Sequence, residues 1–92
     1  MIKSIRHKGL RGLYDLDDAS GVSPEHLKKL RNILARLDAA RVVSDMDLPG
    51  LQLHALYGDR ASYWAVTVCA NWRVSFRLSK NDASDVDYFD YH

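Results

Sequence analysis

The chain has 92 residues, of which 47% are hydrophobic and 27% are charged, and its formal net charge is +1. This length and composition support a single globular domain over residues 1–92 and exclude a disordered chain and a membrane-spanning helix. The N-terminal MIKSIRHKG lacks the apolar segment of a signal peptide, and a lone Cys69 excludes an internal disulfide. Both features fit a cytoplasmic location.

The small net charge hides an asymmetry between the two halves of the chain. Residues 1–41 carry nine Lys/Arg against five Asp/Glu, a net +4, whereas residues 42–92 carry four against seven, a net −3. A basic half is compatible with a phosphate-rich partner. Charge alone favours the plainer interpretation of a solvated helix surface.

Two helices are expected in the N-terminal half, after a short strand over residues 2–6. The first spans Lys8 to Leu16, with apolar residues near helical spacing. The second is the clearest element, because Ser23 can cap it and Pro24 suits its first position, and we expect it to run to Ala40. Its apolar stripe consists of Leu27, Leu30, Ile33, Leu34 and Leu37. One more turn, capped by Ser44, is expected over residues 44–47.

Four strands are expected in the C-terminal half, over residues 51–56, 63–69, 73–79 and 83–91. In the central hairpin, period two places on one face the side chains of Trp64, Val66, Val68, Val74, Phe76 and Leu78. To bring both apolar sets to the same face, the hairpin needs an odd loop such as residues 70–72, with Asn71 in the left-handed conformation and Cys69 paired with Arg73. The opposite face then carries Tyr63, Thr67, Arg73, Ser75 and Arg77.

The order of these elements predicts an α+β fold. Two N-terminal helices pack on one face of a mainly antiparallel, twisted sheet, and the other face stays open. That open face is polar, aromatic and cationic, so it is the expected working surface.

Few residues have the chemistry of a site. The sequence has no phosphate-binding glycine loop and no zinc-ligand spacing, so we expect no cofactor and no metal. His7 and His26 are expected on the surface at helix starts, whereas His54 lies within a strand, where a structural histidine is the more common occupant. Arg73 lies in a strand interior and needs a partner or a purpose. An ion pair with one of three acids is as good an explanation as a functional role; these acids are Asp85, Asp87 and Asp90.

The end of the chain adds aromatic residues to this picture. Period two places Phe89 and Tyr91 on the face opposite Tyr88, which leaves one aromatic face partly open. Aromatic rings interleaved with cations suit unstacked RNA bases. Arginine, histidine, carboxylate and tyrosine together could cleave RNA, because a 2′-hydroxyl attacks the adjacent phosphate once a base removes its proton.

Five segments resemble the HigB toxins of the RelE/ParE superfamily, in the killer-protein branch of bacterial toxin–antitoxin modules. They are MIKSIRHKGL, ARLDAA, LPG-x-x-LH-x-L-x-GD, YWAVTV-x-ANWRVSF and DVDYFDYH, and the resemblance covers essentially the full chain. It implies a RelE/ParE-like fold and a ribosome-dependent mRNA endonuclease that cuts translated messages in the A site without a metal. The implied partners are the 70S ribosome, mRNA and a HigA-like helix-turn-helix antitoxin, with DNA reached only through the antitoxin and no membrane.

The resemblance also implies roles for individual residues. Arg73 matches the arginine that stabilises the scissile phosphate, and His54 matches the strand histidine of proton transfer or substrate positioning. The C-terminal catalytic cluster is matched by Asp90, Tyr91 and His92. Contacts to mRNA or ribosomal RNA are expected from Lys3, Arg6, Lys8, Lys28, Lys29, Tyr57 and Arg77.

One position departs from the family pattern. Family members commonly have Lys where this chain has Tyr57, and a neutral tyrosine cannot supply that cation. We therefore expect weaker cleavage or an altered preference unless Arg60 or Arg77 reaches the site. Two other functions stay open: a non-enzymatic toxin of the same fold that poisons a protein target, as ParE relatives do, and a simple antitoxin-binding module.

Overall fold

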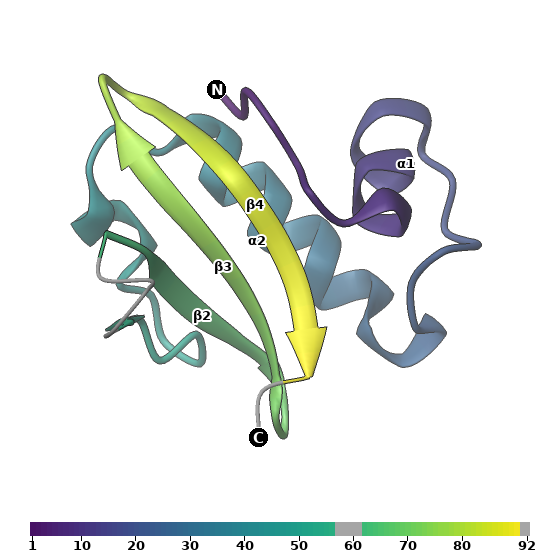
Figure 1. The fold of residues 1–92 in the computed structure, drawn as a ribbon. Helices are drawn as coiled ribbons and strands as arrows, with labels where there is room; N and C mark the ends of the chain where they lie inside the picture. Colours follow the sequence, from purple (N-terminus) through teal and green to yellow (C-terminus); the bar gives the residue numbers. More distant parts are fainter. Residues whose placement is uncertain (57–61, 91–92) are drawn as a thin grey trace.

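Two α-helices and a four-stranded antiparallel sheet make up the computed structural model, which describes residues 1–56 and 62–90 (Figure 1). The helices are α1 (Lys8–Leu16) and α2 (Leu27–Ala39), with short 3-10 turns η1 (Pro24–His26) and η2 (Val43–Met46). The strands are β1 (His54–Ala55), β2 (Trp64–Cys69), β3 (Trp72–Ser79) and β4 (Asp82–Asp90). They pair in the order β1-β2-β3-β4, so the predicted α+β class is confirmed.

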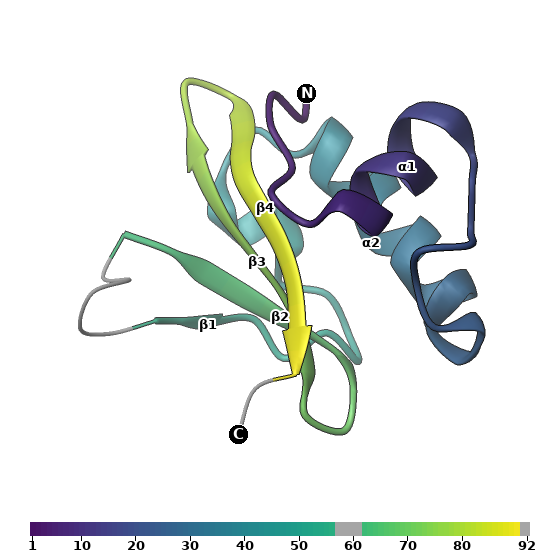
Figure 2. The same ribbon diagram turned by 45° about the vertical axis from the view of Figure 1, so that its right-hand side comes forward.

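Helix α2 covers one face of the sheet. It crosses behind β3 and β4 in Figure 1, and α1 lies beside it, next to the N-terminal segment (Figure 2). The predicted stripe is buried at Leu30, Ile33, Leu34 and Leu37, which join one core with the predicted apolar face of the hairpin. Each such side chain contributes roughly 1.5–3 kcal/mol by leaving water. No helix of the described residues covers the other face of the sheet.

The helices begin and end close to the predicted residues. At the start of α1, His7 Nδ1 accepts a hydrogen bond of 3.0 Å from the Leu10 amide, and at its end Asp17 takes a left-handed φ of 55°. Ser23 adopts the extended N-cap conformation, but its side chain makes no capping hydrogen bond and the first turn is 3-10 rather than α. Leu16, the last residue of α1, is 78% exposed.

The N-terminal segment lies alongside β4 but does not form the predicted continuous strand. Ile2 and Ile5 make isolated parallel bridges to Ala83 and Val86. Both isoleucines are buried although they are three residues apart. A regular strand would point them to opposite faces, so the core contact of both side chains requires the backbone to leave the strand conformation.

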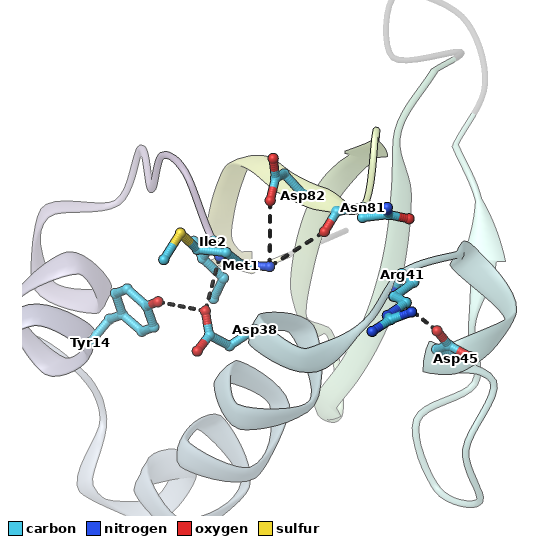
Figure 3. A network of polar contacts seen from close by, with 8 residues as sticks. All are labelled: Met1, Ile2, Tyr14, Asp38, Arg41, Asp45, Asn81 and Asp82. Atoms are coloured by element: carbon cyan, nitrogen blue, oxygen red, sulfur yellow. Dashed lines mark hydrogen bonds and ion pairs between the residues drawn. The ribbon is translucent and has the colours of Figure 1, made fainter.

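Hydrogen bonds to Asp38 connect the N-terminal segment to both helices (Figure 3). Asp38 Oδ1, near the end of α2, accepts hydrogen bonds from the Ile2 amide at 3.0 Å and from the Tyr14 hydroxyl at 2.6 Å. These donors favour the carboxylate and lower the pKa of Asp38, and the same contact raises the pKa of Tyr14 to about 12. The terminal ammonium lies 3.6 Å from Asp82 Oδ1, so Met1 is held against the start of β4.

The central hairpin reaches the predicted pairing of faces by a different route. The loop has two residues, since Cys69 pairs with Trp72 rather than with Arg73, and the register shifts between Thr67 and Cys69. The extra residue in this β-bulge puts the apolar side chains of both strands on the same face. The sequence analysis expected a three-residue loop to do this. The left-handed residue of the turn is Ala70, with a φ of 50°, and not Asn71.

The strand predicted over residues 51–56 is much shorter than expected. Only His54 and Ala55 pair with β2, because Gln52 has a φ of 51° that interrupts the extended backbone. The preceding turn is still attached to the sheet, since the Thr67 amide donates to Leu51 O at 2.6 Å. In the 3-10 turn η2, the capping side chain is that of Asp45 and not of Ser44. Asp45 Oδ2 accepts hydrogen bonds from the amides of residues 41 and 42. In residues 1–56 and 62–90, the helices are too short or too polar to cross a membrane.

Two glycines allow the start of α1 to touch the loop before η1. A Cβ on Gly9 would lie 2.0 Å from the backbone oxygen of Gly21. Gly12, one turn further along the same helix, has nothing closer than 3.9 Å to the corresponding position.

We predict that Gly9→Ala destabilises the protein by about 1–3 kcal/mol, because backbone must move to admit the methyl group. Gly12→Ala is the matched control and should stabilise by up to about 1 kcal/mol, since alanine is the better helix former. Urea denaturation of both variants measures the two changes. Equal stability of the variants would contradict the close backbone approach.

Candidate functional site

The uncovered face of the sheet carries three rows of residues, two of them formed by strand pairing and one by side-chain contacts. The first row, nearest the hairpin turn, contains Thr67, Arg73 and Phe89. The second contains His54, Ala65, Ser75 and Asp87. The third contains Tyr63, Arg77 and Asp85, which are joined by side-chain contacts. Paired residues point to the same side of a pleated sheet, so the predicted polar face exists as one surface.

The Arg73 guanidinium is held at the hairpin turn. Its Nη1 donates to the carbonyl oxygens of Ala70 at 2.6 Å and Trp72 at 3.2 Å. The side chain is half-buried and lies on the face away from the helices. Two of the three acids offered as ion-pair partners make other contacts, because Asp85 binds Arg77 and Asp87 accepts from the Tyr88 amide. A fixed guanidinium on an open face can bind an anion.

His54 faces the same surface from β1, two strands away from Arg73. Its Nδ1 lies 2.9 Å from Gln52 O. A carbonyl oxygen can only accept, so in the neutral ring Nδ1 carries the proton and Nε2 carries the lone pair. The left-handed backbone of Gln52, whose side-chain oxygen accepts from Thr67 Oγ1 at 3.1 Å, thus sets the tautomer of His54. The imidazole is prepared to accept a proton at Nε2.

Ser75 lies at the centre of the face and is fully buried. Within the described part of the chain its Oγ has no hydrogen-bond partner. Its neighbours across the sheet are Ala65 and Asp87. Arg73 and Arg77 lie two residues away on either side, and neighbouring side chains cover Ser75 completely.

The third row is a cluster that the sequence analysis did not anticipate. Asp85 Oδ2 accepts from Tyr63 Oη at 3.2 Å and pairs with Arg77 Nη1 at 3.3 Å. The Arg77 guanidinium lies 5.8 Å from the centroid of the Tyr63 ring. Asp85 reaches both because it occupies a β-bulge in β4 with a φ of 52°. Arg77 therefore contacts Asp85 at the far end of the face from Arg73. The only signal for the bulge in the sequence is the tolerance of Asp for that conformation.

The C-terminal residues divide between the two faces. Phe89 pairs with Arg73 and shares its face, as predicted. Asp90 pairs with Trp72, so the strand directs it to the opposite face, that of Trp72 and Tyr88. Tyr91 and His92, like Tyr57 and Arg60, lie outside the described residues. The structure thus puts His54 and Arg73 on one face of the sheet, two strands apart, and the role of Asp90 stays a prediction.

The predicted basic contacts are spread over the N-terminal segment and the helices. Lys3, Arg6, Lys8 and Lys28 are exposed. Lys29 is half-buried, and its Nζ donates to Gly50 O at 3.0 Å, which ties α2 to the turn before β1. None of these contacts tests an RNA-binding role, which stays a prediction.

Of the two histidines expected on the surface at helix starts, His26 is buried, so that prediction is wrong for His26. His26 is 6% exposed, and its Nδ1 lies 2.6 Å from Tyr88 Oη. His7 is half-buried, with its ring 5.1 Å from that of Tyr88. Trp72 completes the cluster at 4.8 Å from the Tyr88 ring. The burial of Tyr88 raises the pKa of its hydroxyl, which is therefore protonated at neutral pH and can donate to His26. No spacing in the sequence indicated this contact, because it joins residues 62 positions apart.

The fold has helices on one face of the sheet and leaves the other face, which carries both arginines and carboxylates, open. The sequence matches the HigB-like toxin family, described as the RelE-like toxin of the type II toxin–antitoxin system HigB, over residues 3–92. It is 39% identical to the Endoribonuclease HigB of Proteus vulgaris over 92 residues, which is the full length of both chains. The chain belongs to the HigB-like toxin family, and the resemblance drawn from the sequence is confirmed. This membership implies an antitoxin as a partner.

We predict that Tyr88→Phe destabilises the protein by about 1–3 kcal/mol, because it leaves the buried His26 nitrogen without its partner. The change corresponds to a fall in melting temperature of roughly 4–8 °C per kcal/mol in a domain of this size. Tyr14→Phe is the control, since its acceptor Asp38 is exposed and water can replace the lost hydroxyl. A melting temperature for Tyr88→Phe at or above that of Tyr14→Phe would contradict the buried hydrogen bond.

Proposed function

We propose that this protein is the toxin of a type II toxin–antitoxin module and an endoribonuclease that cuts translated mRNA in the A site of the 70S ribosome. The observation that carries the proposal is the placement of Arg73 and His54 on one uncovered face of the sheet, with the tautomer of His54 set by Gln52 O. The identity to the Endoribonuclease HigB of Proteus vulgaris supports it. The proposed partner that neutralises it is a HigA-like helix-turn-helix antitoxin.

The proposed reaction uses the 2′-hydroxyl of the substrate as its nucleophile. His54 Nε2 accepts the proton of that hydroxyl, and the resulting oxygen attacks the adjacent phosphorus. The bond from phosphorus to the 5′-oxygen of the next nucleotide breaks, which leaves a 2′,3′-cyclic phosphate and, once an acid supplies a proton, a 5′-hydroxyl. Within the C-terminal cluster of Asp90, Tyr91 and His92, the proposed source of that proton is His92 and the proposed surface for the base is Tyr91, because the pairing of Asp90 with Trp72 directs Asp90 to the other face.

The proposed role of Arg73 is to stabilise the charge that gathers on the phosphoryl oxygens. Its position is fixed before substrate binds, because Nη1 is held by two carbonyl oxygens of the turn. A cation that needs no reorganisation during the reaction lowers the barrier more than a mobile one. Phe89, its neighbour on β4, offers an aromatic ring to the same nucleotide.

We predict that Arg73→Ala lowers the cleavage rate by at least about 100-fold, as the loss of one fixed transition-state donor does in other enzymes. Mapping of mRNA ends after expression in growing cells measures it, and codon-phased cuts should disappear. Arg36→Ala is the control, because it removes an exposed cation from α2 on the other side of the molecule. Growth arrest that survives Arg73→Ala with intact mRNA would overturn the nuclease.

We predict that His54→Ala lowers kcat by about 10²- to 10⁴-fold, the usual contribution of a general base. Binding to programmed ribosomes should change little, because Arg73 and the basic surfaces are retained. Single-turnover cleavage on purified ribosomes separates the two quantities. If His54→Ala weakened binding and left the single-turnover rate unchanged, His54 would be a substrate-positioning residue and not the base.

A further inference from the structure

The cluster of Tyr63, Arg77 and Asp85 lies on the same face as Arg73 but at the other end of β3. We propose that it is a second RNA subsite, which holds a phosphate and a base of a nucleotide next to the one that is cut. This inference rests on the proposed function, because it assigns a further contact to the same RNA strand.

The spacing of the two arginines supports separate phosphates. Arg73 and Arg77 are four residues apart on β3, about 13 Å at ~3.3 Å per residue. Their guanidinium groups are also held apart, since Arg73 Nη1 is bound at the hairpin turn and Arg77 Nη1 at Asp85. One phosphate cannot contact both groups. A strand lying along β3 brings a neighbouring phosphate to Arg77.

The contacts of Arg77 prepare it for such a phosphate. Asp85 is bound through Nη1, and among the described residues none accepts a hydrogen bond from Nη2 or Nε. The Arg77 side chain is 47% exposed, so these donors can be reached from the solvent. A carboxylate on one edge of a guanidinium fixes its plane and leaves the second edge for a bidentate contact.

Tyr63 supplies the aromatic part of the subsite. It is half-buried, its hydroxyl is fixed by Asp85, and its ring has the Arg77 cation on it. Stacking of bases on aromatic rings next to arginine is the usual way in which proteins bind single-stranded RNA without reading its sequence.

The backbone of β4 also indicates a functional position. Asp85 holds a φ of 52° in a β-bulge, and its amide donates to Ser4 Oγ at 2.8 Å. Bulges redirect side chains and are common beside functional sites. Here the bulge turns the carboxylate onto the open face, where it orients both Arg77 and Tyr63.

The test measures binding of a short fluorescent single-stranded RNA to the full chain and cleavage of mRNA on purified ribosomes. We expect Arg77→Gln to weaken binding by about 3- to 10-fold and to reduce the salt slope of log K by about 0.7, the value for one phosphate contact on a single strand. The KM on ribosomes should rise more than kcat falls. Arg77→Lys should recover the salt slope, and Arg36→Gln should leave all of these quantities unchanged.

Tyr63 is tested by a pair of variants. Tyr63→Ala should weaken RNA binding by about fivefold or more, whereas Tyr63→Phe, which keeps the ring, should retain most of it. Melting temperatures identify any variant that is not folded. If Arg77→Gln or Tyr63→Ala does not fold, the conservative variants Arg77→Lys and Tyr63→Phe are compared with the wild type instead.

Two results distinguish the failure of this subsite from the failure of the proposed function. If the wild type cleaves mRNA and Arg77→Gln changes neither binding, salt slope nor KM, the subsite is wrong and the nuclease stands. If the wild type does not cleave but Arg77→Gln and Tyr63→Ala still weaken RNA binding, the RNA surface stands and the nuclease is wrong.

Discussion

The phase of β3 is the constraint on which the rest of the structure depends. Along this strand Val74 and Phe76 point into the core, and Arg73, Ser75 and Arg77 point to the open face. A shift of one residue would exchange the two sets and bury two arginines beneath α2. Two β-bulges prevent this shift: one between Thr67 and Cys69 in the pairing with β2, and one in β4 opposite Phe76. The site is therefore fixed by the same register that forms the core.

The core and the site are coupled through neighbouring residues of the same strands. Arg73 lies between Trp72 and Val74 on β3, and Phe89 follows Tyr88 on the neighbouring strand β4. Trp72 and Tyr88 are held from below by the buried His26 at the start of α2. The hydrogen bond between His26 and Tyr88 thus supports the strand positions from which Arg73 and Phe89 project. Packing on the helix side of the sheet therefore positions the side chains of Arg73 and Phe89 on the open side.

The two arginines of the open face differ in the groups that hold them. Arg73 donates to two carbonyl oxygens of the hairpin turn, which orient the guanidinium. Arg77 pairs with the Asp85 carboxylate, which offsets much of its field. The first arrangement fixes the direction of the Arg73 guanidinium at the hairpin turn. The second suits a modest contact that must release its RNA.

The sequence by itself determined the two helices, the sheet and the faces of the hairpin, because periodic apolar residues are a local pattern that packing then satisfies. The position of Arg73 on the open face was predicted from the same local pattern. The resemblance to the toxin family was also drawn from short segments of the sequence. Only the tertiary structure decided the bulges, the isolated bridges of Ile2 and Ile5, and the truncation of β1 to His54–Ala55. It also decided the burial of His26 against Tyr88 and the joining of Tyr63, Arg77 and Asp85. These features depend on contacts between residues far apart in the sequence, and such contacts produce no periodic pattern that could be recognised in the sequence.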